Sequence, residues 1–440
     1  MLLIYTPHIT NRLRYTLNFI FNDFLGIEYK TTNSIDEYNN TTALAKLNYS
    51  RTAGTDIEIM LFPHGLLKET GINEQTIKVA SHSGTPMFFG TSANATLPYD
   101  LFACVFYMIS RYEEYLPTIR DNHDRFHPQN TLAFQNNFLQ LAVVDRWIMQ
   151  LQGVLLDKFP TLKYKNRGYE YISTIDIDNA YAYLHKGLIR STLSLVRDVV
   201  HLDVKQLTER FRVFAGMSND PYNTYEYIHA QHKKHNTKVI FFFLVGHYGQ
   251  YDTNLSIKNK SFQSLIKSIA DVSTVGLHPS YGSNTEERYL AREKKSLERV
   301  THRYLTASRQ HFLKLQFPET YRRLLLEDFK DDYSMGFAQQ PGFRAGTCTP
   351  FLFYDLDLES ETKLRIHPFQ VMEATLHLYQ KLSIDEAKHT IAQLVKETKH
   401  VQGTFISLWH NETLSENSIW KNWRGVFEYC LEEASDNLKI

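Results

Sequence analysis

The chain has 440 residues, of which 43% are hydrophobic and 22% charged, so it is long enough for two or three ordinary domains and is not of a composition that stays disordered. Its 48 basic and 48 acidic side chains cancel, and no overall field favours nucleic acid or an anionic membrane as a partner. Cys104, Cys348 and Cys430 lie far apart without CxxC spacing, which argues against a disulfide framework or a thiolate zinc site.

The sequence predicts neither export nor a membrane span. Its N-terminus, MLLIYTPHITNRLRYTL, has a short apolar start followed by basic residues, without a long apolar region or a small-residue cleavage site. The longest apolar runs, at 101–109 and 239–246, are about half the length that crosses a bilayer. We therefore expect a cytoplasmic protein without a transmembrane segment.

Residues 1–162 are predicted to form a smaller α/β module whose role the sequence does not indicate. Short strand candidates (LLIYT, IEIMLF, PMFFGT) are mixed with probable helices at 99–115 and 141–157. Catalytic residue types do not gather in this part of the sequence. The adjacent Glu113 and Glu114 of SRYEEYLP are interpreted as a solvated helix end.

Residues 163–440 repeat a pattern of strand, polar loop and helix, which predicts an α/β fold with a largely parallel sheet closed into a barrel of seven or eight strands. Two amphipathic stretches at about 183–236 are predicted to be a helical insertion between the first two strands. The predicted strands are YEYISTID (169–176), KVIFFFLVG (238–246), STVGLH (273–278), RQHFLKL (309–315), DYSMGF (332–337), KLRIHPF (363–369) and TFISLWH (404–410).

Two aspartates, Asp176 and Asp178, stand at the end of the first of these strands in STIDIDNAY. Residues i and i+2 of a strand point to the same side, so both carboxylates are expected at the C-terminal end of the barrel, where active sites lie. Two adjacent carboxylates repel, and their pairing makes sense if one binds a cation while the other accepts a proton. The alternative is that DxD begins a loop and caps the next helix.

Later strands begin or end with histidine and arginine. His278 follows STVGL, Arg309 and His311 begin RQHFLKL, and His410 ends TFISLWH. A single histidine beside apolar residues is usually structural, but three at strand edges together with an aspartate pair favour a site. Histidine and aspartate without cysteine suit Zn²⁺ or a related divalent metal with an open coordination position.

The order of these segments resembles the NodB-homology domain of the polysaccharide deacetylases, carbohydrate esterase family 4, a distorted (β/α) barrel that removes acyl groups from N-acetylated sugars with a bound divalent metal. STIDID resembles its first motif, which implies Asp176 as catalytic base and Asp178 as metal ligand. GLHPS resembles the histidine motif and implies His278 as a ligand. SRQH resembles the arginine motif and implies Arg309 beside the base, while SLWH resembles the last motif and implies His410 as proton donor.

One position departs from that pattern. The family usually has a second metal histidine four residues after the first, and here that position is Gly282. Either the second ligand comes from elsewhere, with His311 the nearest candidate, or the metal is weak or missing. Alternatively, His311 contacts the substrate or Asp176.

Three residues are assigned to substrate binding. Arg344 lies in the turn GFRAGT and would clamp a carboxylate or phosphate, or else it pairs with the acidic DLDLES segment downstream. Tyr281, in GLHPSYG, and Trp409, in SLWH, are also assigned to substrate binding.

The expected function is metal-dependent hydrolysis of an acetamide on an N-acetylated sugar or glycan precursor, with zinc as the metal and a sugar-containing small molecule as the partner. Asp176 would take the proton of a water, oriented and kept ionised by Arg309, and His410 would protonate the departing nitrogen. Two alternatives stay open: hydrolysis of another C–N bond on the same barrel, or a metal-poor carbohydrate-binding or scaffold protein without catalysis.

Overall fold

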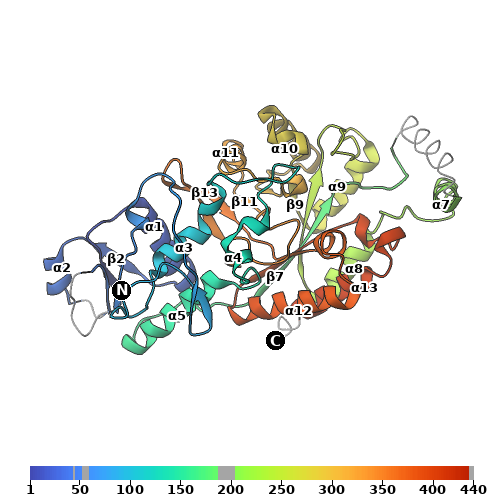
Figure 1. Ribbon diagram of the computed structural model, residues 1–440. Helices are drawn as coiled ribbons and strands as arrows, with labels where there is room; N and C mark the ends of the chain where they lie inside the picture. The colour runs from blue at the N-terminus through green and yellow to red at the C-terminus, as the bar shows by residue number, and fades with distance from the viewer. Residues whose placement is uncertain (43–44, 52–58, 187–203, 436–440) are drawn as a thin grey trace.

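The structure, a computed structural model, describes residues 1–42, 45–51, 59–186 and 204–435. Figure 1 shows a small sheet near the N-terminus, in blue, and a larger sheet in the middle of the molecule, both flanked by helices. Within the described ranges, no helix is both long and apolar enough to span a bilayer.

The small sheet is parallel throughout, with the strand order β2-β1-β3-β4. A separate antiparallel pair, β5 and β6, follows it in sequence. The strands of these two sheets are β1 (Leu2–Tyr5), β2 (Tyr29–Thr32), β3 (Ala45–Tyr49), β4 (Ile59–Leu61), β5 (Ala80–His82) and β6 (Thr85–Met87). The helices around them are α1 (Asn11–Leu17), η1 (Asn18–Leu25), α2 (Ile35–Asn40), η2 (Leu66–Lys68), α3 (Leu101–Ile109), η3 (Tyr112–Glu114), η4 (Pro128–Asn130), α4 (Leu132–Gln135) and α5 (Val143–Lys158).

The larger sheet has nine strands, and all neighbours are parallel except β12 and β13. Its order in space is β12 (Phe351–Asp355), β13 (Ser360–Ile366), β11 (Asp331–Asp332), β10 (Ala307–Ser308), β9 (Thr274–His278), β8 (Lys238–Leu244), β7 (Glu170–Ile177), β15 (Thr404–His410) and β14 (Val371–Met372). The β-strand to helix alternation expected from the sequence is therefore present.

Helices cover the outer face of this sheet, as Figure 1 shows for α8, α9, α12 and α13. The helix α12 starts at a capping box, in which the Ser383 hydroxyl accepts from the Glu386 N–H and the Glu386 carboxylate accepts from the Ser383 N–H. The helices of this region are α7 (Val204–Phe214), α8 (Tyr225–His235), α9 (Lys260–Val272), η5 (Tyr281–Asn284), α10 (Glu287–Thr301), η6 (His311–Leu313), α11 (Glu319–Leu326), η7 (Thr375–Tyr379), α12 (Ile384–His400), η8 (Glu412–Leu414), η9 (Ser418–Trp420) and α13 (Arg424–Ser435).

The predicted insertion at about 183–236 contains α7 and α8. Its first predicted helical stretch, 188–202, lies outside the described residues. The predicted boundary between residues 162 and 163 stays a prediction.

Strands of the larger sheet alternate between two cores. On β15, Ile406 and Leu408 face an inner cluster, whereas Phe405 and Trp409 face the outer core under the helices. On β8, Phe242 is likewise part of the inner cluster. The inner cluster collects side chains from both halves of the sheet, so the sheet curls around it, and a side chain's place in the alternation decides which core it meets.

The segment between β13 and β14 bonds both to the chain that follows β11 and to β15. Here the Phe369 N–H donates to the Met335 carbonyl, and the Gln370 N–H donates to the Ile406 carbonyl on β15. Two adjacent residues thus connect the side of β11 to the side of β15.

Two predicted strands are mostly wrong. No strand forms at 309–315. The strand β10 ends at Ser308, and the chain then turns into η6, in which Phe312 has a φ of 59°. The strand expected at 332–337 stops at Asp332, because that carboxylate accepts hydrogen bonds from the Ser334 N–H and hydroxyl and folds the chain into a turn.

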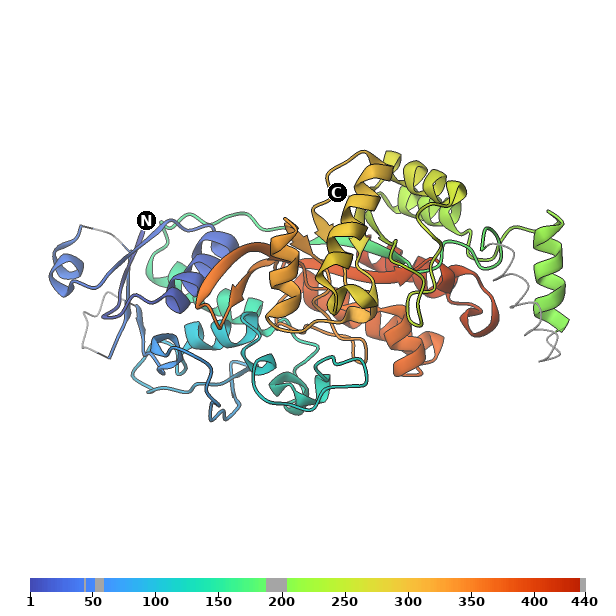
Figure 2. The same cartoon turned by 90° about the horizontal axis from the view of Figure 1, so that it is seen from above.

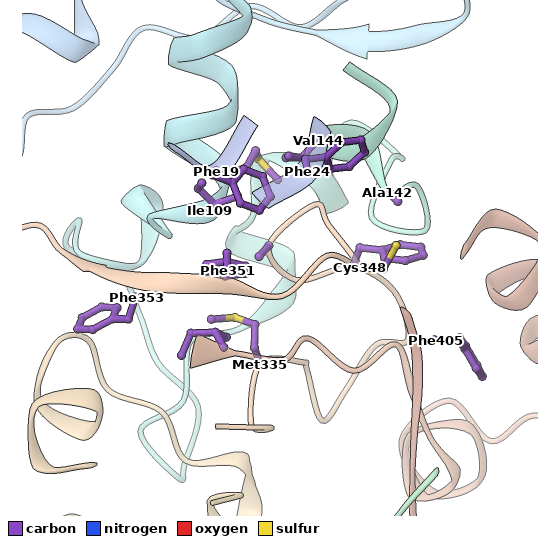
Figure 3. Close-up of a cluster of buried hydrophobic side chains, with 14 of the residues drawn as sticks. Phe19, Phe24, Ile109, Ala142, Val144, Met335, Cys348, Phe351, Phe353 and Phe405 are labelled. Atoms are coloured by element: carbon purple, nitrogen blue, oxygen red, sulfur yellow. The ribbon is translucent and has the colours of Figure 1, made fainter. Parts of the chain in front are cut away.

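One hydrophobic core joins the N-terminal region to the larger sheet. Phe19 and Ile109 pack above Phe351 of β12, with Met335 below it (Figure 3). Figure 2 shows β12 and β13, in orange, reaching toward the blue helices, where the Tyr15 hydroxyl donates to the Leu352 carbonyl at 2.7 Å. The N-terminal region, residues 1–162, is therefore packed against β12 and β13, at one side of the larger sheet.

Ion pairs reinforce this contact, and they correct one sequence interpretation. Glu113 and Glu114 are buried, not solvated, because they pair with Arg111. Glu114 also binds Arg344 across the contact.

Candidate functional site

Four side chains meet because they stand at the carboxyl ends of neighbouring parallel strands. Asp176 is near the end of β7 and Asp178 follows it, His278 is the last residue of β9, and His410 is the last residue of β15. Parallel strands end at the same edge of a sheet, so strand order alone brings these residues together.

His311 reaches the same place by another route. It starts the short helix η6 just after β10, and its ring centroid lies 5.0 Å from that of His278. The turn that follows it is sharp, because Phe312 and Leu313 both have positive φ values of 59° and 53°.

Asp178 is the centre of the cluster. Its Oδ1 lies 3.1 Å from His278 Nε2, and its Oδ2 lies 3.5 Å from His311 Nε2. One ligand atom from each of the three residues lies within 4.8 Å of the others, so the set is able to hold a metal ion. Within the described residues, His278 Nε2 and Asp178 Oδ1 are buried without a hydrogen bond, as expected of atoms directed at a common third atom.

The two imidazoles are held by their other nitrogen. His278 Nδ1 donates to the Arg309 carbonyl at 2.5 Å, and His311 Nδ1 donates to the Asp252 carboxylate at 2.8 Å. These bonds leave both Nε2 atoms facing Asp178. A carbonyl or carboxylate behind each histidine is the usual arrangement around a metal.

The charges in the cluster reinforce one another. Burial alone would raise the pKa of Asp178, but the positive charge of His311 and the nearby His278 hold it well below its usual range. Burial would lower the pKa of His311, yet Asp178 and Asp252 outweigh it and raise that pKa to about 9. Asp178 and His311 therefore each favour the charged form of the other.

His410 belongs to a second pair at the edge of the cluster. Its Nδ1 donates to the buried Glu373 carboxylate at 2.7 Å, and its Nε2 lies 3.8 Å from Asp178 Oδ2. Burial opposes protonation, but the charge of Glu373 raises the pKa of His410 well above its usual range. This raised pKa favours the protonated imidazole, whose Nε2 faces the site.

Arg309 directly follows β10 and is fully buried. Its guanidinium stands 5.1 Å from the ring centroids of both Phe242 and Phe369, and none of its nitrogens has a hydrogen-bond partner among the described residues. Burial lowers the pKa of Arg309, and attraction to Asp176 opposes that change.

The cluster opens into a pocket of about 240 Å³. Its polar lining includes Asp176, Asp178, His278, His311 and His410, and most of its other lining residues are apolar. The remaining lining residues are Arg125, Gln310, Phe312, Leu313, Ala338, Met372, Ala374, Leu378, Tyr379, Leu408, Glu412, Thr413 and Trp420.

The three predicted substrate-binding residues do not line this pocket. Trp409 points to the outer core, where its ring contacts Phe427, because it is one residue out of phase with His410. Arg344 is buried against Glu114 and does not pair with the DLDLES segment. Tyr281 lies near the rim, with its ring centroid 5.5 Å from that of Phe312.

Sequence reasoning missed Asp252, Glu373, Glu412 and Arg125. Asp252 follows the predicted strand 238–246, so the rule that sites gather after strand ends would have included it. Glu373 follows β14, which has only two residues and gives no strand signal. Arg125 belongs to the N-terminal region, and no pattern in the sequence connects it to the pocket.

Comparison with known proteins gives limited likenesses. Residues 2–160 match a family of unknown function, DUF7033. No curated protein matches the chain.

Solved structures give weak matches. A protein from Mycobacterium smegmatis described as a polysaccharide deacetylase is 13% identical, with a TM-score of 0.40, over 61% of this chain and 86% of its own. A polysaccharide deacetylase from Bacillus cereus is 12% identical, with a TM-score of 0.29, over 62% and 89%. A 4-alpha-glucanotransferase from Thermococcus litoralis is 11% identical, with a TM-score of 0.35, over 62% and 38%. Scores this low carry no argument, so the function must be inferred from the site.

Proposed function

We propose that the chain is a metal-dependent hydrolase that removes the acetyl group from an N-acetylated sugar or glycan precursor, on a distorted (β/α) barrel of the NodB type. The observation that carries the proposal is the meeting of Asp178, His278 and His311 in one pocket with Asp176 and His410. A metal triad, a carboxylate and a protonated histidine are the groups that amide hydrolysis needs.

The donor set fits zinc. One carboxylate and two imidazoles, each imidazole held through its Nδ1, leave coordination positions for water and substrate. Gly282, where the resemblance would have a second histidine, offers no ligand atom, and a Cβ there would lie 3.3 Å from the Tyr289 ring, which would have to shift slightly. We therefore assign the second imidazole to His311.

When bound there, a divalent cation would polarise the acyl carbonyl and lower the pKa of a bound water. In the proposed reaction Asp176 accepts the proton of the attacking water, a role supported by its Oδ1, which is buried without a hydrogen bond to any described residue. His410, held by Glu373, donates its Nε2 proton to the departing nitrogen. Leu408 and Met372 form an apolar surface next to the cluster that suits the methyl group of an acetyl.

Metal content is the first test. Purified protein is expected to hold about one zinc per chain, and Asp178→Ala and His278→Ala are expected to lose it. His367→Ala is the matched control, because His367 forms a similar pair with Asp331, at 2.8 Å, outside the pocket. Equal metal content in all three variants would contradict the proposed centre.

Acetate release from a panel of N-acetylated sugars is the second test. Release that depends on zinc and on Asp176 supports the deacetylase. Bound metal without acetate from any sugar favours hydrolysis of another C–N bond, and absence of metal favours a binding protein without catalysis.

A further inference from the structure

One side chain from the N-terminal region lines the pocket. Among the lining residues that the structure describes, Arg125 alone comes from residues 1–162. Its side chain is only 7% exposed, so it is built into the wall and does not lie loosely on the surface.

The turn that carries Arg125 is rigid. The Asp121 carboxylate accepts hydrogen bonds from the N–H groups of His123 and Arg125 and from the Arg125 Nε, at 2.7 to 2.9 Å. It also accepts a hydrogen bond, at 2.7 Å, from the side-chain amide of Gln339, which belongs to the C-terminal part of the chain, residues 163–440. The position of the guanidinium is thus fixed before any ligand binds.

Arg125 is also joined to the metal-binding cluster through the backbone. Its Nη1 donates to the Phe312 carbonyl at 2.8 Å, and Phe312 is the residue after His311. Its Nη2 makes no hydrogen bond to any described residue. A fixed, buried guanidinium on the wall of a pocket, with donors to spare, is suited to a carboxylate or phosphate.

We propose that Arg125 binds an anionic group on the substrate, so that the N-terminal region selects N-acetylated sugars that carry a carboxylate or phosphate. The selection of a substrate for deacetylation rests on the proposed function, whereas the binding of an anionic sugar by Arg125 does not. It gives the N-terminal region a role at the site, where it supplies a specificity-determining residue.

A purely structural role makes a different prediction. Arg125 supports the Phe312 turn, whose positive φ is strained, and loss of that support would disturb His311 for every substrate equally. Loss of an anion contact would affect only charged substrates. The comparison of charged and neutral sugars therefore separates the two roles.

The experiment uses the full chain loaded with zinc and three sugars: N-acetylglucosamine, N-acetylglucosamine 1-phosphate and N-acetylmuramic acid. Arg125→Ala is expected to lower kcat/KM by about 10- to 100-fold for whichever charged sugar is the better substrate, and by less than about threefold for the neutral one. Arg125→Lys is expected to recover part of that loss. Arg120→Ala is the matched control. Arg120 belongs to the same turn, where its backbone forms a β-bridge with that of Phe126, but it does not line the pocket.

Calorimetric binding of the same sugars decides the inference even if no acetate is released. Tighter binding of a charged sugar than of the neutral one, lost in Arg125→Ala at unchanged zinc content, supports it, and the phosphate and carboxylate arms identify the anion. An equal loss for all three sugars, or no preference for either charged sugar in the unmodified protein, overturns it. Failure of catalysis alone, with the binding preference intact, counts against the proposed hydrolase and not against the anion contact.

Discussion

Two buried arginines differ in how their charge is paired. Arg344 lies at the contact between the two regions, and Arg309 lies next to the candidate site, where its carbonyl accepts from His278. Arg344 gives two hydrogen bonds to Glu114, at 2.9 and 2.5 Å, and one to the Gly336 carbonyl at 2.9 Å. Arg309 is equally buried, but its guanidinium has two aromatic rings around it and makes no hydrogen bond to a described residue. A fully paired charge joins two parts of the fold, whereas an unpaired one costs folding free energy, as is typical of functional sites.

The largest expected effect concerns catalysis in the pocket. Asp176→Asn removes the proposed proton acceptor and should lower kcat by about 10²- to 10⁴-fold, because a general base contributes on that scale. Zinc content and the free energy of unfolding should stay close to those of the unmodified protein. Asp331→Asn, on the same sheet but outside the pocket, should keep nearly full activity. Similar losses in both variants would remove the distinction between pocket and scaffold.

The two arginines themselves allow a matched comparison of stability. Arg344→Met leaves Glu114 buried with one cation fewer and should lower the free energy of unfolding by about 3–5 kcal/mol. Arg309→Met loses the ring contacts but also removes a buried charge without hydrogen bonds, so the change should be no more than about 1 kcal/mol. Chemical denaturation measures both. If Arg309→Met lowers the free energy of unfolding as much as Arg344→Met does, then Arg309 stabilises the fold to the same extent as Arg344.

The carboxylates extend the comparison to pH. Glu114 is paired with arginines, whereas Glu293 accepts, among the described residues, only from the Ser280 N–H and hydroxyl, and burial raises the pKa of Glu293 to about 7. Between about pH 4.5 and 7 the folded chain therefore holds a proton that the unfolded chain releases. The free energy of unfolding should fall by on the order of 3 kcal/mol as the pH rises through this window.

Glu293→Gln keeps an acceptor for Ser280 and removes the titration. The free energy of unfolding of this variant should not show the decrease that the titration of Glu293 causes between pH 5 and pH 7. Chemical denaturation at the two pH values measures it. The same pH dependence in Glu293→Gln and the unmodified protein would show that Glu293 titrates normally.

The smallest expected effect concerns the residue behind His311. Asp252→Asn weakens the carboxylate that orients this imidazole and should reduce zinc affinity by about 10- to 100-fold, without abolishing binding. Competition with a chelator of known affinity measures it. Asp271→Asn, an exposed aspartate at the end of α9, is the control and should bind zinc normally. Unchanged affinity in Asp252→Asn would mean that His311 is not a ligand.

The sequence could predict those parts of the site that follow from strand periodicity. Asp176, His278 and His410 were found because continuous apolar strands end at them, and parallel strands share one edge. The helix expected at 141–157 is confirmed as α5 for a similar local reason, its 3.6-residue pattern.

The remaining parts depend on packing that no local pattern encodes. His311 reaches the cluster through a turn with positive φ values, not through the strand that its neighbours suggested. Glu114 meets Arg344 across 230 positions of sequence, and Arg125 meets Phe312 across 187. Such contacts form only after the two regions have packed, so no local pattern in the sequence indicates the pairing of Arg344 with Glu114 or the place of Arg125 at the pocket.

The most direct measurement is a crystal structure of the zinc-loaded protein with anomalous scattering recorded at the zinc edge. We predict a single strong peak in the pocket, at about 2.0–2.2 Å from a carboxylate oxygen of Asp178 and from Nε2 of both His278 and His311. A peak elsewhere, or a pocket in which these three side chains turn away from one another while zinc is bound, would contradict the shared metal centre.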